Sequence, residues 1–271
     1  MTRLSLATWN INSVRLRIGR VVDFLKRESP DVLCLQEIKC LEDQFPRKAF
    51  EAAGYKHIHL SGQKGMHGVA TVSRLPIEAV ETPPLCQHGH ARCAAIKVAG
   101  VEIDNLYVPA GADIPDPVVN DKFAHKLDFV ERMRAHYQAR ARSKSRPPLF
   151  VVGDINIAPE ENDVWSHRQL LDVVSHTPVE TDGLKRILKD GKFLDIARAK
   201  HPPNEKLYTW WSYRAADWQA SNRGRRLDHI WADARATPMV DVDSYAIHTV
   251  ERGGEKPSDH VPVMVSFEVP G

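Results

Sequence analysis

Polar side chains that could bind a metal ion or transfer a proton lie at the ends of several apolar segments of this 271-residue chain. A polar group at the end of a buried strand costs free energy unless it is paired, ligated or used in chemistry. Because such groups recur along the chain, we expect them to share one cleft. The segments are Trp9-Asn10-Ile11-Asn12, Gln36-Glu37-Ile38-Lys39, Gly153-Asp154-Ile155-Asn156, Arg226-Leu227-Asp228 and Ser258-Asp259-His260.

Asn10, Glu37 and Asp259 offer hard oxygen ligands. Mg²⁺ prefers one or two carboxylates together with waters and phosphate oxygens. Softer transition metals call for Cys or grouped His, which do not accompany these positions. Any one of these residues alone is better explained as a turn or cap residue. As a set they predict a site for Mg²⁺ or Mn²⁺.

Asp154 and Asn156 lie two residues apart in Gly153-Asp154-Ile155-Asn156. On an extended backbone both side chains point the same way, while Ile155 turns toward the core. A carboxylate there can take a proton from an attacking water or orient it, and the amide can hold that water by a hydrogen bond. An Asx-turn is the alternative interpretation of this segment alone.

His260 precedes a predicted strand, and Asp228 lies in another apolar segment. A carboxylate that fixes the tautomer of a histidine can present the imidazole to a phosphate oxygen. A buried, hydrogen-bonded histidine is an equally good interpretation of His260 taken alone. Because the chain has neither a Gly-x-Ser-x-Gly nor a Gly-x-x-x-x-Gly-Lys-Ser/Thr motif, metal-assisted hydrolysis of a phosphoester is the chemistry that these groups predict.

The elements that must position these groups begin with a β-α-β unit. Alternation predicts a strand over residues 4–9, and an apolar stripe predicts a helix over residues 14–28 that Pro30 ends. A second strand over residues 31–36 would place Asn10 and Glu37 side by side, just past the ends of parallel strands.

Further strands are predicted after this unit, together with a long amphipathic helix over residues 120–142 and a helix near residues 182–189. Ala99-Gly100 predicts a tight hairpin, so an all-parallel sheet fits poorly and two packed, mixed or mostly antiparallel sheets with outer helices fit better. We expect one α/β domain over residues 1–271, since no linker-like tract divides the chain. The predicted strands are residues 69–73, 94–98, 101–108, 149–152, 227–231, 243–247 and 261–269.

Composition is that of an ordinary globular protein, with 42% hydrophobic and 27% charged residues. We therefore expect no membrane insertion, and we take a monomer as the default state. A net charge of +2 requires no polyanionic partner, so local clustering matters more. One segment combines cations with aromatics, which suits contact with phosphate and with bases or sugars, although a structural aromatic cluster is the alternative. It contains Trp210, Trp211, Arg214, Trp218, Arg223, Arg225 and Arg226.

Four cysteines show no paired framework, and the N-terminus enters a strand-like segment at once, so we expect a cytoplasmic setting. Cys86-x-His88-x-His90-x-x-Cys93 could be drawn as a zinc site. Its ligands are crowded into one short segment, unlike the separated pairs of structural zinc, and Cys93 enters a predicted strand. An ordinary loop is the interpretation that this pattern favours.

The ordered motifs resemble the exonuclease III family of apurinic/apyrimidinic endonucleases, within the endonuclease/exonuclease/phosphatase superfamily. The resemblance extends over nearly the whole chain and implies a four-layer α/β sandwich with two facing mixed sheets flanked by helices. It also implies Mg²⁺- or Mn²⁺-dependent hydrolysis of DNA 5′ to abasic sites, with 3′→5′ exonuclease and 3′-end trimming activities. The motifs are those above, extended to Thr8-Trp9-Asn10, Tyr107-Val108-Pro109 and Ile157-Ala158-Pro159.

The resemblance also implies a role for individual residues. Glu37 would bind the metal with Asn10 nearby, and Asp259 would support the metal or His260. Asp154 would activate or position water that Asn156 orients, and His260 with Asp228 would engage the phosphate. The remaining implied residues are Tyr107 at the transition state, Arg92 on a flanking phosphate, and Trp210 with Trp211 and Leu227 around an extruded abasic sugar.

Two positions depart from the family pattern. Ala110 replaces the usual amide after Tyr107-Val108-Pro109, and Arg225 stands where an apolar pocket residue is common, so we count Arg225 among the residues that contact DNA. Double-stranded DNA with abasic sites or 3′ ends is the expected partner. The alternatives are a superfamily phosphoesterase acting on a lipid or small-molecule phosphate, and a DNA-binding module without catalysis.

Overall fold

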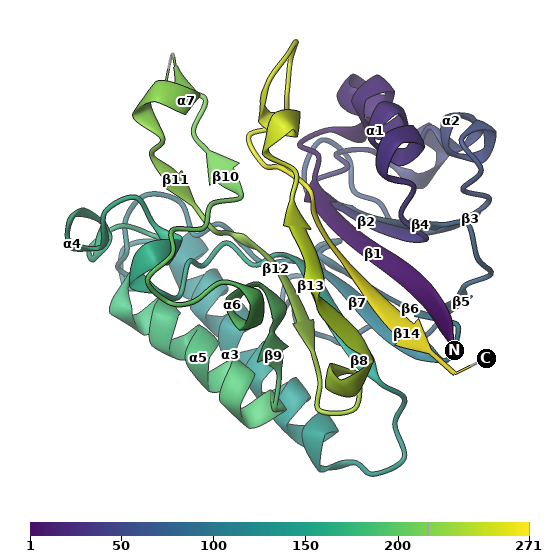
Figure 1. The fold of residues 1–271 in the computed structure, drawn as a ribbon. Coiled ribbons are helices and arrows are strands. Elements are labelled where there is room, and N and C mark those ends of the chain that lie inside the picture. The colour runs from purple at the N-terminus through teal and green to yellow at the C-terminus, as the bar shows by residue number, and fades with distance from the viewer. Residues whose placement is uncertain (216, 271) are drawn as a thin grey trace.

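Two six-stranded sheets pack face to face, and helices cover the outer faces (Figure 1). The computed structural model describes residues 1–215 and 217–270. The first sheet contains β1 (Thr2–Asn10), β2 (Val32–Gln36), β3 (His57–Ser61), β4 (Val69–Ser73), β13 (Val240–Ile247) and β14 (Val263–Val269). The second contains β5 (Glu78–Ala79), β6 (Cys93–Val98), β7 (Val101–Tyr107), β8 (Leu149–Asp154), β9 (Leu194–Asp195) and β12 (Asp228–Ala232).

Both sheets are mixed. The first has the order β13-β14-β1-β2-β4-β3, in which only β1 and β2 pair in parallel. The second has the order β5-β6-β7-β8-β12-β9, in which only β7 and β8 pair in parallel. A separate two-stranded ribbon joins β10 (Trp210–Trp211) to β11 (Gly224–Arg225).

Helices α1 and α2 cover the first sheet, and α3 and α5 cover the second (Figure 1). None of the described helices is long and apolar enough to cross a membrane. The α-helices are α1 (Val14–Glu28), α2 (Arg47–Ala52), α3 (Asp121–Arg142), α4 (His167–Leu170), α5 (Pro178–Gly191), α6 (Ile196–Lys200) and α7 (Trp218–Ser221). Short 3₁₀ turns are η1 (Glu42–Gln44), η2 (Glu161–Asp163), η3 (Thr237–Met239) and η4 (Thr249–Arg252).

The central core lies between the two sheets, and strand alternation decides which side chains enter it. In β1, Leu4 and Leu6 belong to this inner core, while Ala7 and Trp9 pack against the α1 and α2 layer. In β8, Phe150 and Val152 belong to the inner core, and Val151 packs under α3 and α5. Continuing each inner series by two-residue steps leads to Asn10 and to Asp154 at the strand ends.

The predicted elements agree well with this structure, and the four-layer α/β sandwich is confirmed. The helix over residues 14–28 and the strand over residues 69–73 have the predicted bounds. The hairpin at Ala99-Gly100 joins β6 to β7 as expected. Asn120 caps α3 by accepting hydrogen bonds from the backbone N–H groups of Lys122 and Phe123. The helices and strands that were not predicted are short or partly polar: α2, β3, β5, α4, β9, α6, α7 and the β10–β11 ribbon.

Candidate active site

The strand-end residues converge on one cleft of about 570 Å³ at the edge of the sandwich. Of the thirteen residues that were given a role in the site from the sequence, nine line it, and the other four, Asn10, Arg92, Trp211 and Asp228, are buried side chains. The nine are Glu37, Tyr107, Asp154, Asn156, Trp210, Arg225, Leu227, Asp259 and His260. The expectation of a shared cleft is therefore met.

Asn10 links the carboxylates of the two sheets. Its Nδ2 donates to Oε1 of Glu37 at 2.9 Å and to Oδ2 of Asp154 at 2.8 Å. The parallel pairing of β1 with β2 places Asn10 opposite Gln36, so Glu37 follows directly. Glu37 has a positive φ of 50°, which turns the chain out of β2 at this point. Oε2 of Glu37 also contacts the Lys39 ammonium at 2.8 Å.

Gly153 sets the approach of β8 to β7. Its φ is 136°, and a Cβ there would lie 2.0 Å from the backbone oxygen of Leu106, so no other residue fits without moving the strand. Gly153 lies within β8, and the close pairing of β8 with β7 requires a glycine at this position. This pairing places Asp154 beside Tyr107.

Asn156 holds the carboxylate of Asp154. Its backbone N–H donates to Oδ1 of Asp154 at 3.0 Å, and its Nδ2 donates to Oδ2 at 3.1 Å and to the carbonyl of Val108 at 2.9 Å. The backbone contact is an Asx-turn, which was the alternative interpretation of this segment. Asn156 has a positive φ of 56°, so the extended backbone that we expected ends before this residue, and its role in orienting water stays a prediction. Ile155 is fully buried in the layer under α3 and α5, as expected.

His260 lies between two carboxylates. Its Nδ1 is 2.9 Å from Oδ2 of Asp228, and its Nε2 is 3.7 Å from Oδ2 of Asp154. Antiparallel pairing of β12 with β8 places Asp228 opposite Asp154. Thr209 donates its hydroxyl to the same Oδ2 of Asp228 at 2.6 Å and accepts from the backbone N–H of Asp228. The Asp228–His260 pair predicted from sequence is therefore formed.

The protonation states follow from burial and neighbouring charge. Burial disfavours the imidazolium of His260, but the carboxylates of Asp228 and Asp154 outweigh it and raise its pKa to about 10. Burial also raises the pKa of Asp154, to about 7, although the His260 charge opposes that shift. Burial acts in the same direction on Glu37, but the Lys39 ammonium and the Asn10 amide outweigh it and lower the pKa of this carboxyl.

Tyr107 donates its hydroxyl to Oε1 of Glu37 at 2.9 Å. Burial raises the pKa of this phenol well above its ordinary value, so it stays a neutral donor at physiological pH. The guanidinium of Arg92 lies over the Tyr107 ring at 4.8 Å and donates to the Tyr107 carbonyl. Arg92 is only 6% exposed, and these contacts hold the ring and backbone of Tyr107 in place. The expected contact of Arg92 with a flanking phosphate stays a prediction.

An aromatic and cationic wall stands beside the carboxylates. Trp210 packs with Leu227, and the guanidinium of Arg225 lies 5.3 Å from the centre of the Trp210 ring. Arg225 also donates to the carbonyl of Val174 at 2.9 Å and to the hydroxyl of Ser175 at 2.7 Å. Arg225 therefore spans the pocket wall between the β10–β11 ribbon and the segment before α5.

Two members of the predicted Trp and Arg cluster are structural. Trp211 is 4% exposed, packs against Tyr208 and Trp218, and donates its Nε1 to Asn222. Arg226 is fully buried, and its guanidinium forms ion pairs with Asp163 and Asp195. Arg226 therefore cannot contact DNA, contrary to what the composition of this segment indicated.

Two side chains donate hydrogen bonds to the carboxylate of Asp259. Its Oδ2 accepts from Nε1 of Trp210 at 3.0 Å, and its Oδ1 accepts from the amide of Asn12 at 3.1 Å. Asn12 in turn accepts from the Lys39 ammonium at 2.6 Å. Asp259 thus connects the aromatic wall to the Glu37 side of the cleft.

Two residues that support the candidate active site were not identified from the sequence. Thr209 positions Asp228, and nothing in its local sequence marks that contact. Lys126 lies on the buried face of α3, and its Nζ donates to the carbonyls of Asn156 and Ala110 and pairs with Glu180. A lysine three residues after Phe123, within an apolar stripe, was the signal that could have revealed it.

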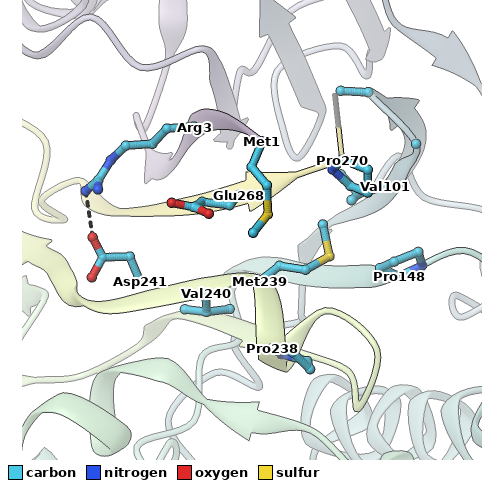
Figure 2. Close-up of a pocket in the computed structure, with 12 residues that line it drawn as sticks. Met1, Arg3, Val101, Pro148, Pro238, Met239, Val240, Asp241, Glu268 and Pro270 are labelled. Atoms are coloured by element: carbon cyan, nitrogen blue, oxygen red, sulfur yellow. Dashed lines mark hydrogen bonds and ion pairs between the residues drawn. The ribbon is translucent and has the colours of Figure 1, made fainter.

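A second cavity, of about 640 Å³, lies at the starts of the strands, by Met1, Val101 and Pro148 (Figure 2). Asn10 and Asp154 end β1 and β8, so this cavity is at the opposite end of the same strands. Among the described residues, the acidic ones that line it are Asp241, paired with Arg3, and Glu268. Its donors are therefore not arranged for metal or proton-transfer chemistry.

Comparison with known proteins agrees with this geometry. The model of the Endonuclease/Exonuclease/phosphatase family matches residues 7–260. The chain is 29% identical to exodeoxyribonuclease III of Haemophilus influenzae, over 98% of this chain and 100% of the relative. It is 34% identical to an AP endonuclease from Archaeoglobus fulgidus, with a TM-score of 0.89, over 98% of this chain and 100% of that one.

A further solved structure is a 3′ phosphatase from Neisseria bound to product DNA hairpin, which is 30% identical with a TM-score of 0.87 over 98% of this chain and 99% of that one. The chain belongs to the Endonuclease/Exonuclease/phosphatase family. Within that family it is a hydrolytic nuclease of the DNA-repair kind.

Proposed function

We propose that this protein hydrolyses the DNA phosphodiester 5′ to abasic sites with Mg²⁺ or Mn²⁺, and that it also removes nucleotides and blocking groups from 3′ ends. The observation that carries the proposal is the hydrogen-bonded set Glu37–Asn10–Asp154, with His260 within reach of Asp154, beside a wall of Trp210 and Leu227. We further propose that residues 1–271 act as one domain, because both sheets contribute to one central core. A monomeric state and a cytoplasmic location stay predictions from the sequence.

Glu37, with Asn10 nearby, fits a hard divalent cation. The carboxylates of Glu37 and Asp228 lie close to that of Asp154, and burial together with these neighbours raises the pKa of Asp154 to about 7. Oxygen donors of this kind suit Mg²⁺ or Mn²⁺. Asp154, Asp228 and His260 also bring ligand atoms within 4.8 Å of one another. Because Nδ1 of His260 is hydrogen-bonded to Asp228, we place the cation on the Glu37 side, with Asp259 as a supporting carboxylate.

A bound cation would neutralise the charge that builds on the phosphate and the leaving oxygen. Asp154 is poised to accept a proton from an attacking water, since a base acts best with a pKa near the working pH. Asn156 donates both Nδ2 protons to Asp154 and Val108, so its amide oxygen is the group left to orient the water.

His260 is an imidazolium at neutral pH and can donate from Nε2 to a non-bridging phosphate oxygen, while Asp228 fixes its orientation. Tyr107 offers a neutral hydroxyl, which donates to Glu37 in this structure. A hydrogen bond from this hydroxyl to the phosphate would be stronger in the transition state, where negative charge builds on the phosphate oxygens. Each of these roles needs the phosphate to lie across the carboxylates that line the cleft.

The wall beside the carboxylates supports specificity for abasic DNA. A nucleotide without a base is cheap to extrude from the duplex, and Trp210 and Leu227 offer an apolar surface for its sugar. Arg214 and Arg223 also line the cleft and provide positive charge for the DNA backbone. A lipid or small-molecule phosphate would not need this combination.

A second candidate is a nuclease that acts mainly on 3′ ends. The position of Arg225 favours it, because the guanidinium crosses the wall where an abasic sugar would pack. The solved structure that is named as a 3′ phosphatase also supports this candidate, because it is 30% identical to this chain. The two candidates share the same carboxylates and differ in the pocket.

The test is a set of labelled duplexes incubated with Mg²⁺ or with chelator. One carries a single abasic site, one an intact strand with a recessed 3′ end, and one a 3′-phosphate. Metal-dependent incision that leaves a 3′-hydroxyl at the abasic site supports the first proposal. Release of 3′-phosphate without incision supports the second. Turnover of none of these duplexes, with hydrolysis of a soluble or lipid phosphoester, would reject both.

A further inference from the structure

A second cluster of ligand-bearing side chains lies near Arg92, and none of its members lines the cleft of the candidate active site. Cys86 and His90 come from the loop between β5 and β6, and His125 comes from α3. One ligand atom from each of these residues lies within 4.8 Å of the other two, and Sγ of Cys86 is 3.4 Å from Nε2 of His125. None of the three residues has a role in the proposed hydrolysis.

These separations are close to those of a tetrahedral site. With metal–nitrogen bonds of about 2.0 Å and a metal–sulfur bond of about 2.3 Å, tetrahedral ligand atoms lie about 3.3–3.6 Å apart. The Cys86–His125 pair already has this spacing at 3.4 Å. A separation at the 4.8 Å limit would need a contraction of about 1.3–1.5 Å, which side-chain rotation of a loop residue can provide. The exposed ring of His88 lies 4.4 Å from that of His125.

One ring nitrogen of the cluster lacks a hydrogen-bond partner within the part of the chain that the structure describes. Nδ1 of His90 is buried and has no hydrogen-bond partner among the described residues. A buried ring nitrogen without a partner is costly, and a metal ion would satisfy it.

His125 adds a ligand from a second segment of the chain, which the Cys86–Cys93 pattern alone did not contain. Cys86, His88 and His90 crowd one segment, and Cys93 lies buried in β6 with the apolar side chains under α3, as expected from the sequence. His125 is more than thirty residues away in the chain and enters from a different element. The ligands therefore come from two separated segments, as in structural zinc sites.

We propose that Cys86, His90 and His125 bind one divalent transition-metal ion of the zinc type, in a site separate from the catalytic carboxylates. The Cys86 thiol loses its proton to solvent as the sulfur–metal bond forms, and a water or His88 completes the coordination. The ion would tie the loop before β6 to α3. Arg92, which follows this loop, contacts both Tyr107 and His67, so the ion would stiffen the support of the cleft.

The experiment uses Co²⁺ as a spectroscopic probe of the full chain, with Mg²⁺ in excess to occupy the hard-oxygen site. We expect one equivalent of Co²⁺ to produce a thiolate-to-metal charge-transfer band and the visible bands of tetrahedral cobalt. Cys86→Ser should remove the charge-transfer band, and His125→Gln should weaken Co²⁺ binding by about 100-fold or more. Zn²⁺ should displace the cobalt and raise the thermal midpoint of the wild type, but not that of Cys86→Ser.

His136→Gln is the matched control, because His136 is a half-buried histidine on the same helix α3 and is not part of the cluster. It should bind Co²⁺ like the wild type. Circular dichroism and the thermal midpoint in chelator check that each variant folds. A Co²⁺ spectrum without a thiolate band in the folded wild type would overturn the proposal. So would unchanged Co²⁺ affinity in folded Cys86→Ser.

Discussion

The substitution Asp228→Asn removes the negative charge of this side chain and keeps its size and shape. In the wild type, Oδ2 of Asp228 accepts from Nδ1 of His260 and from the hydroxyl of Thr209, while Oδ1 has no partner among the described residues. An asparagine can keep both accepted hydrogen bonds with its amide oxygen and place its NH₂ where Oδ1 was. The variant therefore keeps the orientation of His260 and removes the negative charge beside it.

The size of the effect follows from the pKa of His260. Asp228 is the largest of the influences that raise this pKa to about 10. Without it, burial opposes the remaining carboxylates, and the pKa returns toward the ordinary value of about 6.5. At about pH 8.5 the wild-type imidazole stays almost fully protonated, whereas about 1% of the variant does. We expect a loss of about 100-fold at that pH and of about twofold near pH 6.5.

The assay is single-turnover cleavage of the preferred duplex in saturating Mg²⁺, measured from about pH 6 to pH 9.5. The quantity to compare is the ratio of wild-type to variant rate at each pH, because other groups and the metal titrate in both proteins. We expect this ratio to rise steadily with pH. The variant His260→Gln should lose activity equally across the range.

Two results would refute this reasoning. A wild-type to variant ratio that does not change with pH would show that the charge state of His260 is not what Asp228 controls. A further loss when Asp228→Asn is added to His260→Gln would show that Asp228 acts other than through His260. If Asp228 acts through His260 alone, the double variant has the rate of His260→Gln.

Replacing Asp154 by Asn should reduce turnover by about 10²–10⁴-fold and leave DNA binding in chelator intact, and normal turnover would reject its role as a base. Glu37→Gln should raise the Mg²⁺ concentration needed for half-maximal rate, so an unchanged titration would count against Glu37 as a ligand. Arg225→Ala should open the pocket wall and increase abasic incision relative to 3′-phosphate release, and an unchanged ratio would show that Arg225 does not set specificity. Lys126→Met should destabilise the fold by about 3–5 kcal/mol in urea unfolding, because the buried carboxylate of Glu180 loses its cation and keeps only the hydrogen bonds from Ser175 and Thr177; full stability of the variant would contradict the argument.

Long periodic segments could be predicted because their own sequence carries the signal. The helix over residues 14–28 has an apolar stripe and ends before Pro30, and α3 begins at the cap residue Asn120. The ribbon of β10 and β11 has only two residues in each strand, too few for periodicity to show. Its pairing depends on contacts between distant segments.

The sequence by itself determined the candidate catalytic residue types and their places at strand ends. Asn10, Glu37 and Asp154 follow apolar segments, and His260 precedes one. Strand alternation indicates which way a side chain points, and this local rule needs no knowledge of the partner strand. Order along the chain and strand periodicity were therefore enough to predict a shared cleft.

Only the tertiary structure decided which groups actually touch. Thr209 reaches Asp228, Arg225 crosses the pocket wall to Ser175, and His125 joins Cys86. These contacts join residues that lie far apart in sequence or in different elements, and they depend on how sheets and helices pack. Since packing is set by the whole core at once, no local pattern specifies it.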